Sequence, residues 1–213
     1  MKNNLHKIGL SIVASILIAS ASIAQFEGEI IFEKNVGKIH VIYKYFVKGN
    51  DIRIEEVGED GTIDGIQLMD LETKKTYALS PERKLWFETP NRRPAKTLDV
   101  DIKKTKETRE ILGKKCFEVI VTNKENDRKI IYWITKGDYE FFIPMLKTLN
   151  RKENQAMYYL EIEGMENHFP MLSTEYALST GNVISTLKAE SVEAKKIASE
   201  TFVIPKDYGK FER

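Results

Sequence analysis

Hydrophobic and polar residues alternate with a period of two through most of the first half of the chain. In residues 26–33, Phe26, Ile30 and Phe32 fall on one face, while glutamates occupy the opposite face. Such alternation is typical of β-strands that bury one face. Turn-forming residues separate successive runs, and Gly49-Asn50 between two of them predicts a tight hairpin. The pattern therefore predicts an antiparallel meander of about nine or ten strands.

The hydrophobic spacing becomes helical between residues 138 and 150, where apolar side chains recur at positions i, i+3, i+4 and i+7. Asp138 is the predicted N-cap of this helix. Pro144 falls too late for the first turn of a helix that begins there, so the helix is short, kinked or starts later than the pattern suggests. Residues 153–162 fit a helix or a strand equally well.

Strands are also predicted in the second half of the chain, near residues 107–111, 116–122 and 129–135, and again from Pro170 onward. Asp99-Val100-Asp101 is expected in a solvated loop before the first of these strands. The last long strand is expected to run from Val183 to about Ile197.

The segment 129–135 is apolar on both faces, because Ile130, Tyr132 and Ile134 alternate with Ile131 and Trp133. A strand of this kind needs cover on both faces. The predicted helical segment would cover one face of a curled sheet and enclose an apolar hollow. The side chains predicted to line this hollow are Phe142, Met145, Leu146, Leu149, Trp86 and Trp133.

The first 24 residues have the layout of a secretory signal peptide. Lys2 and Lys7 make the start positive, an apolar stretch follows, and Ser22-Ile23-Ala24 supplies small residues at the −3 and −1 positions of a cleavage site. The apolar stretch is shorter than the roughly 20 residues of a membrane span. The sequence therefore predicts export to the periplasm or outside the cell, no transmembrane anchor in the mature chain, and a single β domain over residues 25–213.

Charge and composition narrow the range of functions. The chain carries 33 basic and 32 acidic side chains, and this balance argues against nucleic-acid binding and against a polybasic membrane anchor. No spacing of His, Cys and Asp suits zinc, and neither a phosphate-binding glycine loop nor a Gly-x-Ser-x-Gly elbow occurs. We therefore predict no cofactor, no metal and no catalytic residue.

The single cysteine, Cys116, cannot close an intramolecular disulfide. We expect it to be a half-buried apolar side chain of a strand. A catalytic thiolate beside Lys114 and Lys115 is the alternative. Since 32 acidic side chains also allow many carboxylate pairs in space, an enzyme is kept as a third interpretation.

Six short segments follow one another in a particular order along residues 26–210. They are Phe26–Ile30, Val47–Ile54, Met69–Tyr77, Leu112–Cys116, Tyr132–Lys136 and Phe202–Tyr208. Together they resemble the pattern of an uncharacterised exported bacterial domain of unknown function that is grouped with the LolA/LolB-like lipoprotein carriers. The resemblance implies a mainly β (α+β) fold, a strongly curved antiparallel sheet or half-open barrel with a short helical lid.

The resemblance also implies that the hollow could take acyl chains, as an analogy at the level of the fold. Taken with the two-sided apolar strands, it predicts an exported, non-enzymatic binding protein for a lipid, an acylated protein or another apolar ligand. The alternative is an envelope interaction or structural protein whose hollow is filled by its own side chains. A lipid or lipoprotein is thus the expected partner, and no carrier motif assigns a binding residue.

Overall fold

The computed structural model describes residues 25–90 and 98–212, and these form one twelve-stranded sheet with two short helices on one face. The signal peptide predicted over residues 1–24 lies outside the described residues. The strands are β1 (Glu27–Val36), β2 (Ile39–Lys48), β3 (Asp51–Val57), β4 (Ile63–Asp70), β5 (Lys75–Ser80), β6 (Leu85–Glu88), β7 (Asp101–Ile111), β8 (Lys114–Asn123), β9 (Arg128–Lys136), β10 (His168–Ala177), β11 (Val183–Ala194) and β12 (Gly209–Lys210).

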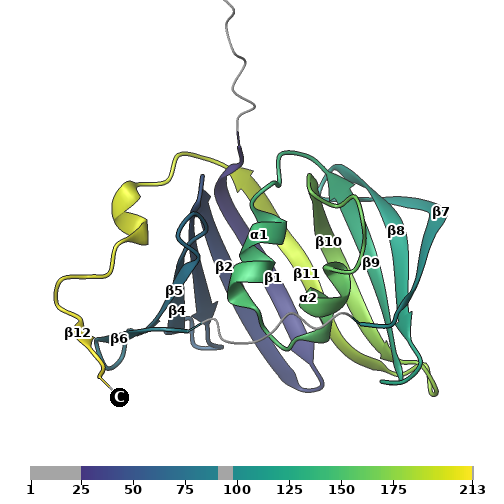
Figure 1. Cartoon of the computed structure of the whole chain (residues 1–213), viewed down its shortest axis with the longest axis horizontal. Helices are drawn as coiled ribbons and strands as arrows, with labels where there is room; N and C mark the ends of the chain where they lie inside the picture. The colour runs from purple at the N-terminus through teal and green to yellow at the C-terminus, as the bar shows by residue number, and fades with distance from the viewer. Residues whose placement is uncertain (1–24, 91–97, 213) are drawn as a thin grey trace, which may run out of the picture.

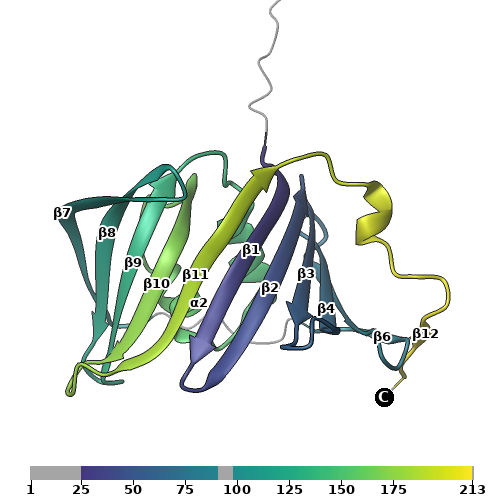
Figure 2. The same ribbon diagram turned by 180° about the vertical axis from the view of Figure 1, so that it is seen from behind.

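Two antiparallel meanders make up the sheet. The first runs outward from β1 to β6, and the second runs from the opposite edge strand β7 inward to β11. They join where β11 pairs with β1, in a ladder that places Gly28 opposite Ala194 and Val36 opposite Ser185. The short strand β12 adds to β6 in parallel. Figures 1 and 2 show the joined meanders from their two sides.

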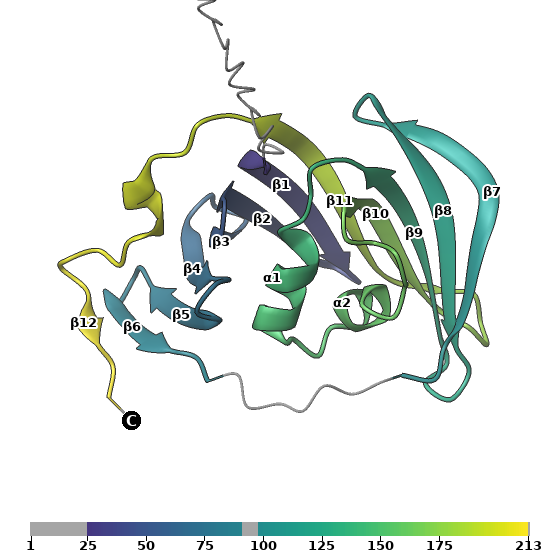
Figure 3. The ribbon, with the colours of Figure 1, turned by 45° about the horizontal axis from the view of Figure 1, so that its top comes forward.

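The sheet curls around the helices without closing. Figure 3 shows α1 (Phe142–Leu149) and α2 (Asn154–Tyr159) inside the curve, with the two edges of the sheet on either side of them. We call the face that carries the helices the inner face and the opposite one the outer face. Twisted sheets of this size curl, and the half-open antiparallel barrel with a short helical lid expected from the sequence is confirmed, with twelve strands instead of nine or ten.

The helices correct and complete the predictions made from the sequence. The helix expected over residues 138–150 begins only at Phe142, so Pro144 lies in its first turn, where no backbone donor is lost. The cap position is Phe141, not Asp138, and no side chain of the described residues caps the helix. The helix ends at Asn150, whose φ of 44° places it in the left-handed region. Residues 153–162, which fitted either structure, contain α2.

Two strand boundaries also differ from the predictions. The strand β7 begins at Asp101, not near residue 107, so the expected solvated loop at Asp99–Asp101 already runs into the sheet. Its side chains are exposed on both faces along almost the whole strand, and this removes the alternation on which the prediction depended. The strand β11 ends at Ala194, short of Ile197. Gly49 takes a φ of 58° in the predicted hairpin between β2 and β3.

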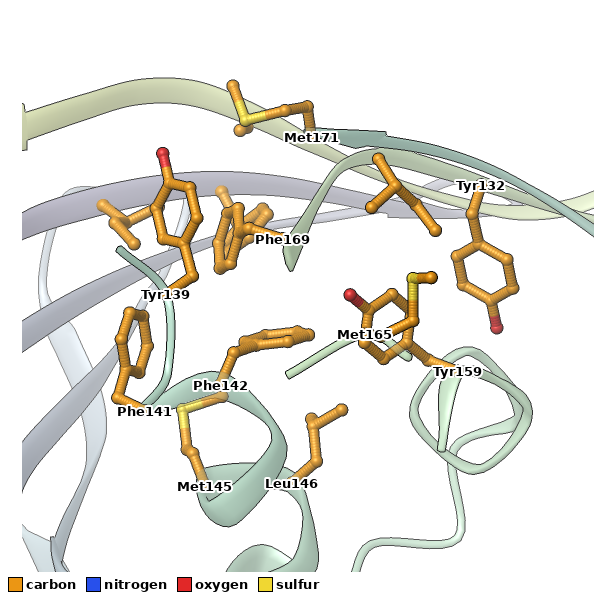
Figure 4. Close-up of a cluster of buried hydrophobic side chains, with 14 of the residues drawn as sticks. Tyr132, Tyr139, Phe141, Phe142, Met145, Leu146, Tyr159, Met165, Phe169 and Met171 are labelled. Carbon is orange, nitrogen blue, oxygen red and sulfur yellow. The ribbon is translucent and has the colours of Figure 1, made fainter. Parts of the chain in front are cut away.

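Apolar side chains gather in a large cluster beneath the helices and in a small one on the first meander. In the large cluster, Phe142 of α1 points toward Phe169 of β10 and Tyr159 of α2 (Figure 4), with ring centroids 4.8 and 5.3 Å from Phe142. The small cluster is built around Ile66, Leu68 and Leu79. Packing under the helices thus comes from strands of both meanders and from the helices themselves.

Candidate functional site

The inner face beneath the helices is filled almost completely by aromatic side chains. Phe32, Phe169, Tyr132 and Tyr159 are buried there, and Tyr139 stacks on Phe169 with ring centroids 4.8 Å apart. Ring pairs at these distances add to the energy of area burial. We call this region, the inner face of β1 and β9–β11, the aromatic half.

A cavity of about 50 Å³ remains between the helices and the sheet. Its lining consists of Phe32, Tyr45, Tyr132, Phe142, Leu146, Leu149, Arg151, Glu153, Gln155, Ala156, Tyr159, Pro170, Ser173 and Leu187. This volume is about a third of the roughly 150 Å³ of an engineered cavity that binds one benzene ring, so the space is too small for an acyl chain as it stands. The hydroxyl of Tyr159 is buried without a hydrogen-bond partner among the described residues.

A second cavity, of about 120 Å³, lies on the inner face of the first meander. Its walls are Tyr43, Ile54, Glu56, Gly65, Ile66, Gln67, Ala78, Leu79 and Arg151. Small or polar residues, Gly65, Gln67 and Ala78, occupy the inward positions of β4 and β5 at this cavity. A Cβ atom built on Gly65 would meet no other atom within 4 Å, so this part of the face is open. We call the inner face of β2–β5 the open half.

Arg151 belongs to the walls of both cavities, between α1 and α2 in sequence. Its guanidinium lies 3.9 Å from Glu153 Oε1, whereas the Lys34 ammonium lies 2.9 Å from the same oxygen. Burial raises the pKa of Tyr43 to about 12, and Arg151 acts in the opposite direction through its charge and a hydrogen bond to the Tyr43 hydroxyl. The guanidinium therefore faces the site as a positively charged group.

A buried polar network ties α2 to the sheet. Glu175 of β10 accepts hydrogen bonds from Asn154 Nδ2 at 2.7 Å and from Ser185 Oγ at 3.0 Å. Gln155 donates to Ser185 Oγ at 3.3 Å, and the Arg128 Nε lies 3.0 Å from Glu175. Hydrogen bonds to a charged group are stronger than neutral ones, so this network fixes the position of α2.

The structure divides the six residues predicted to line the hollow. Phe142, Leu146 and Leu149 of α1 line the smaller cavity. Met145 of the same helix is fully buried in the large cluster and lies outside the lining of both cavities.

The two predicted tryptophans lie away from these cavities. Trp133 follows Tyr132 in β9 and faces the outer side, where the Arg109 guanidinium carbon lies 4.2 Å from its ring centroid. Such cation–π contacts are common at partly exposed sites. Trp86 packs against the small cluster, together with Ile204 and Tyr208 of the C-terminal segment. The structure therefore does not bring either tryptophan together with the α1 residues.

Two residues that line the larger cavity, Arg151 and Gln67, were not predicted from the sequence. Gln67 Oε1 is buried in the wall of the larger cavity without a hydrogen-bond partner in the described part of the chain. Gln67 lies two residues before Met69, which belongs to the large cluster, and therefore points to the same face of β4. A polar residue in the inward register of a strand was the signal that could have revealed it.

Little in the described residues suggests catalysis. Cys116 is buried, and burial raises the pKa of its thiol, which disfavours the reactive thiolate. Within residues 25–90 and 98–212, no group of three His, Cys, Asp or Glu side chains is placed to hold a metal ion. None of the helices in the described ranges is long and apolar enough to cross a membrane.

Comparison of the sequence with family models gives one match, a domain of unknown function (DUF4412) that covers residues 26–208. The chain belongs to the DUF4412 family. The domain of unknown function that the sequence resembled is thereby confirmed. No curated protein matches the chain.

Solved structures with a similar fold are distant in sequence. An uncharacterized conserved protein from Thermus thermophilus has a TM-score of 0.55 and 8% identity, with 87% of this chain and 89% of that chain covered. MucB from the Pseudomonas aeruginosa MucA/MucB complex has a TM-score of 0.49 and 9% identity, with 86% of this chain and 57% of that chain covered. A LolA superfamily protein from Nitrosomonas europaea has a TM-score of 0.36 and 12% identity, with 85% of this chain and 91% of that chain covered. These likenesses concern the fold alone.

Proposed function

We propose that this DUF4412 protein is an exported, non-enzymatic binding protein that takes up the apolar part of a lipid or an acylated protein between α1 and the open half. The observation that carries the proposal is the cavity of about 120 Å³ on the inner face of the first meander. Ligand sites are concave and mostly apolar, with a few polar groups that fix orientation. The open half has this character, with Ile54 and Ala78 beside Gln67 and Arg151.

A long acyl chain needs more room than the two cavities offer, so α1 has to shift when such a ligand enters. The helix rests on the sheet with Phe142, Met145 and Leu146, which are apolar and buried. Apolar contacts have no directional requirement, so an acyl chain can replace them at little cost. α2 would stay in place, because Glu175 and its partners hold it by directed hydrogen bonds.

The proposed export rests on the sequence of residues 1–24, which has the positive start, apolar stretch and small cleavage-site residues of a signal peptide. An exported binding protein of this kind would act in the periplasm or outside the cell. A lipid carrier needs a water-soluble domain with an apolar interior that can be shared with its cargo.

The decisive experiment measures uptake of a fluorescent fatty acid by the purified protein and by two matched variants. Ala78→Phe places a ring in the larger cavity, and Thr174→Phe places the same ring on the outer face of β10, opposite Ile131. We expect Ala78→Phe to weaken binding about tenfold or more and Thr174→Phe to leave it within about twofold. Equal binding by all three proteins would contradict the proposal.

The tight packing of the aromatic half favours a second candidate, an envelope interaction protein whose hollow is filled by its own side chains. Only about 50 Å³ remains beneath the helices. Native mass spectrometry of protein purified from its own host without detergent separates the two candidates. Bound lipid supports the binding function, whereas protein that is always ligand-free and takes up no fluorescent fatty acid supports the second candidate.

A further inference from the structure

Arg151 differs from the other half-buried cations with ion pairs. Lys34, Arg53 and Arg128 have side chains that are 16, 15 and 31% exposed, and each lies within 3.0 Å of a carboxylate oxygen. The Arg151 side chain is 27% exposed, and its Nη1 atom lies 3.9 Å from the carboxylate oxygen Oε1 of Glu153. Among these four described cations, Arg151 is therefore the one that lacks a close anionic partner.

Partial burial makes such a charge costly unless a counter-charge or hydrogen-bond acceptors compensate it. A guanidinium has five N–H donors in a planar fork. One interaction is with the Tyr43 hydroxyl. Glu153 Oε1 bonds to the Lys34 ammonium at 2.9 Å and lies 3.9 Å from Arg151 Nη1, which is too far for a hydrogen bond. Within the described residues, Arg151 thus has donors left over at a position that borders both cavities.

The surroundings of Arg151 indicate what an incoming group would look like. Ile54 and Ala78 form an apolar wall of the larger cavity, and Gln67 presents an amide oxygen that has no partner among the described residues. Glu56, which also borders this cavity, is exposed, so water and salt screen its charge. The site therefore suits a small acceptor group attached to an apolar chain.

We propose that Arg151 binds the carboxylate of a single-chain acidic amphiphile, such as a fatty acid, whose alkyl chain lies between α1 and the open half. This proposal deepens the binding function above and rests on it. The planar guanidinium fork matches a carboxylate in a bidentate arrangement, which is stronger and more specific than a single hydrogen bond. The larger cavity, about 120 Å³, has room for such a head group and the first carbon atoms of its chain.

The test compares decanoate with decan-1-ol, which have the same chain length and differ in the charge of the head group. Isothermal titration calorimetry at pH 8 measures the affinity of the purified protein, Arg151→Gln, Arg151→Lys and Lys152→Gln for both ligands. Lys152→Gln is the matched control, because it removes the same charge from the adjacent residue, which is exposed and lines neither cavity.

We expect the unmodified protein and Lys152→Gln to bind decanoate about tenfold more tightly than decan-1-ol. Arg151→Gln should lose this preference while its affinity for decan-1-ol stays unchanged, and Arg151→Lys should keep part of it. The role of Arg151 would be overturned if the unmodified protein bound both ligands with the same affinity, or if Arg151→Gln kept the preference for decanoate. The proposed binding function would stand in either case. Failure of the unmodified protein to bind either ligand would overturn the binding function itself and this inference with it.

Discussion

The two halves of the inner face belong to one continuous sheet, yet they are packed differently. In the aromatic half, the inward positions carry rings such as Phe32, Tyr132 and Phe169, and little space remains beneath the helices. In the open half, Tyr43 and Ile54 face inward from β2 and β3, but β4 and β5 carry Gly65, Gln67 and Ala78 at their inward positions, and a cavity remains. The difference teaches that one continuous sheet, with core residues in both meanders, packs tightly against the helices in one region and leaves a cavity in another.

The largest expected effect comes from removing a ring of the aromatic half. Phe169 is fully buried, with the rings of Tyr139 and Phe142 at 4.8 Å. Phe169→Ala should lower the free energy of unfolding by about 3–5 kcal/mol, because it leaves a cavity in a packed core. Chemical denaturation measures this loss. Phe211→Ala is the control, since Phe211 is half-exposed and its removal should cost less than about 0.5 kcal/mol. A similar loss in both variants would mean that the rings do not form the stabilising core.

A smaller effect, with opposite signs in the two halves, is expected from replacing glutamine by methionine. Gln155 of the aromatic half donates a hydrogen bond to Ser185, so Gln155→Met should cost about 1 kcal/mol. Gln67 of the open half buries an amide oxygen without a partner in the described chain, so Gln67→Met should stabilise the protein by about 1 kcal/mol. Thermal unfolding of both variants tests the comparison. Destabilisation by both would show that the Gln67 amide has a partner in solution.

The smallest effect concerns pH and the end of the aromatic half. His168 of β10 has a buried Nδ1 without a partner in the part of the chain that the structure describes, and its ring meets that of Phe117 edge-on at 5.6 Å. Burial lowers the pKa of His168 below its usual value of 6.5; Lys136 and Lys104 act in the same direction, and Glu166 opposes them.

Because the folded-state pKa is below the unfolded-state pKa, the stability contributed by the neutral imidazole is complete above about pH 6.5 and is lost as the pH falls through the lowered value. The melting temperature of His168→Gln should therefore fall less between pH 7.5 and pH 5 than that of the unmodified protein. His40→Gln, which replaces an exposed histidine, is the control and should follow the unmodified protein. Parallel pH profiles for all three proteins would refute the prediction.

The sequence predicted the sheet and the lid because period-two alternation and helical spacing are local signals. It could not decide which face of β9 is inward, since Tyr132 and Trp133 are both large and apolar. The structure decides this through a distant partner: the Tyr132 hydroxyl donates to the Gln155 carbonyl of α2 at 2.8 Å, while Trp133 meets Arg109 outside. The pattern of apolar residues within one strand does not predict contacts with segments that are far away in sequence.

The candidate site was predicted only where it depends on α1. Phe142, Leu146 and Leu149 follow from helical periodicity and do line a cavity. Arg151 sits in a loop after the helix, and a lone cation in a loop is usually solvated. Its half-buried position depends on two meanders that approach each other in space, which no motif encodes.

The ladder between β1 and β11 joins the first strand of the sheet to its last long strand, since Gly28 pairs with Ala194. Contacts so far apart in sequence are slow to form, because a large loop must close before they contribute. During synthesis, β11 leaves the ribosome only after the first meander, both helices and the rest of the second meander. Until then the two meanders cannot join, and their apolar inner faces stay exposed. Protection of these faces during synthesis is therefore a requirement that the topology itself imposes on the cell that makes this protein.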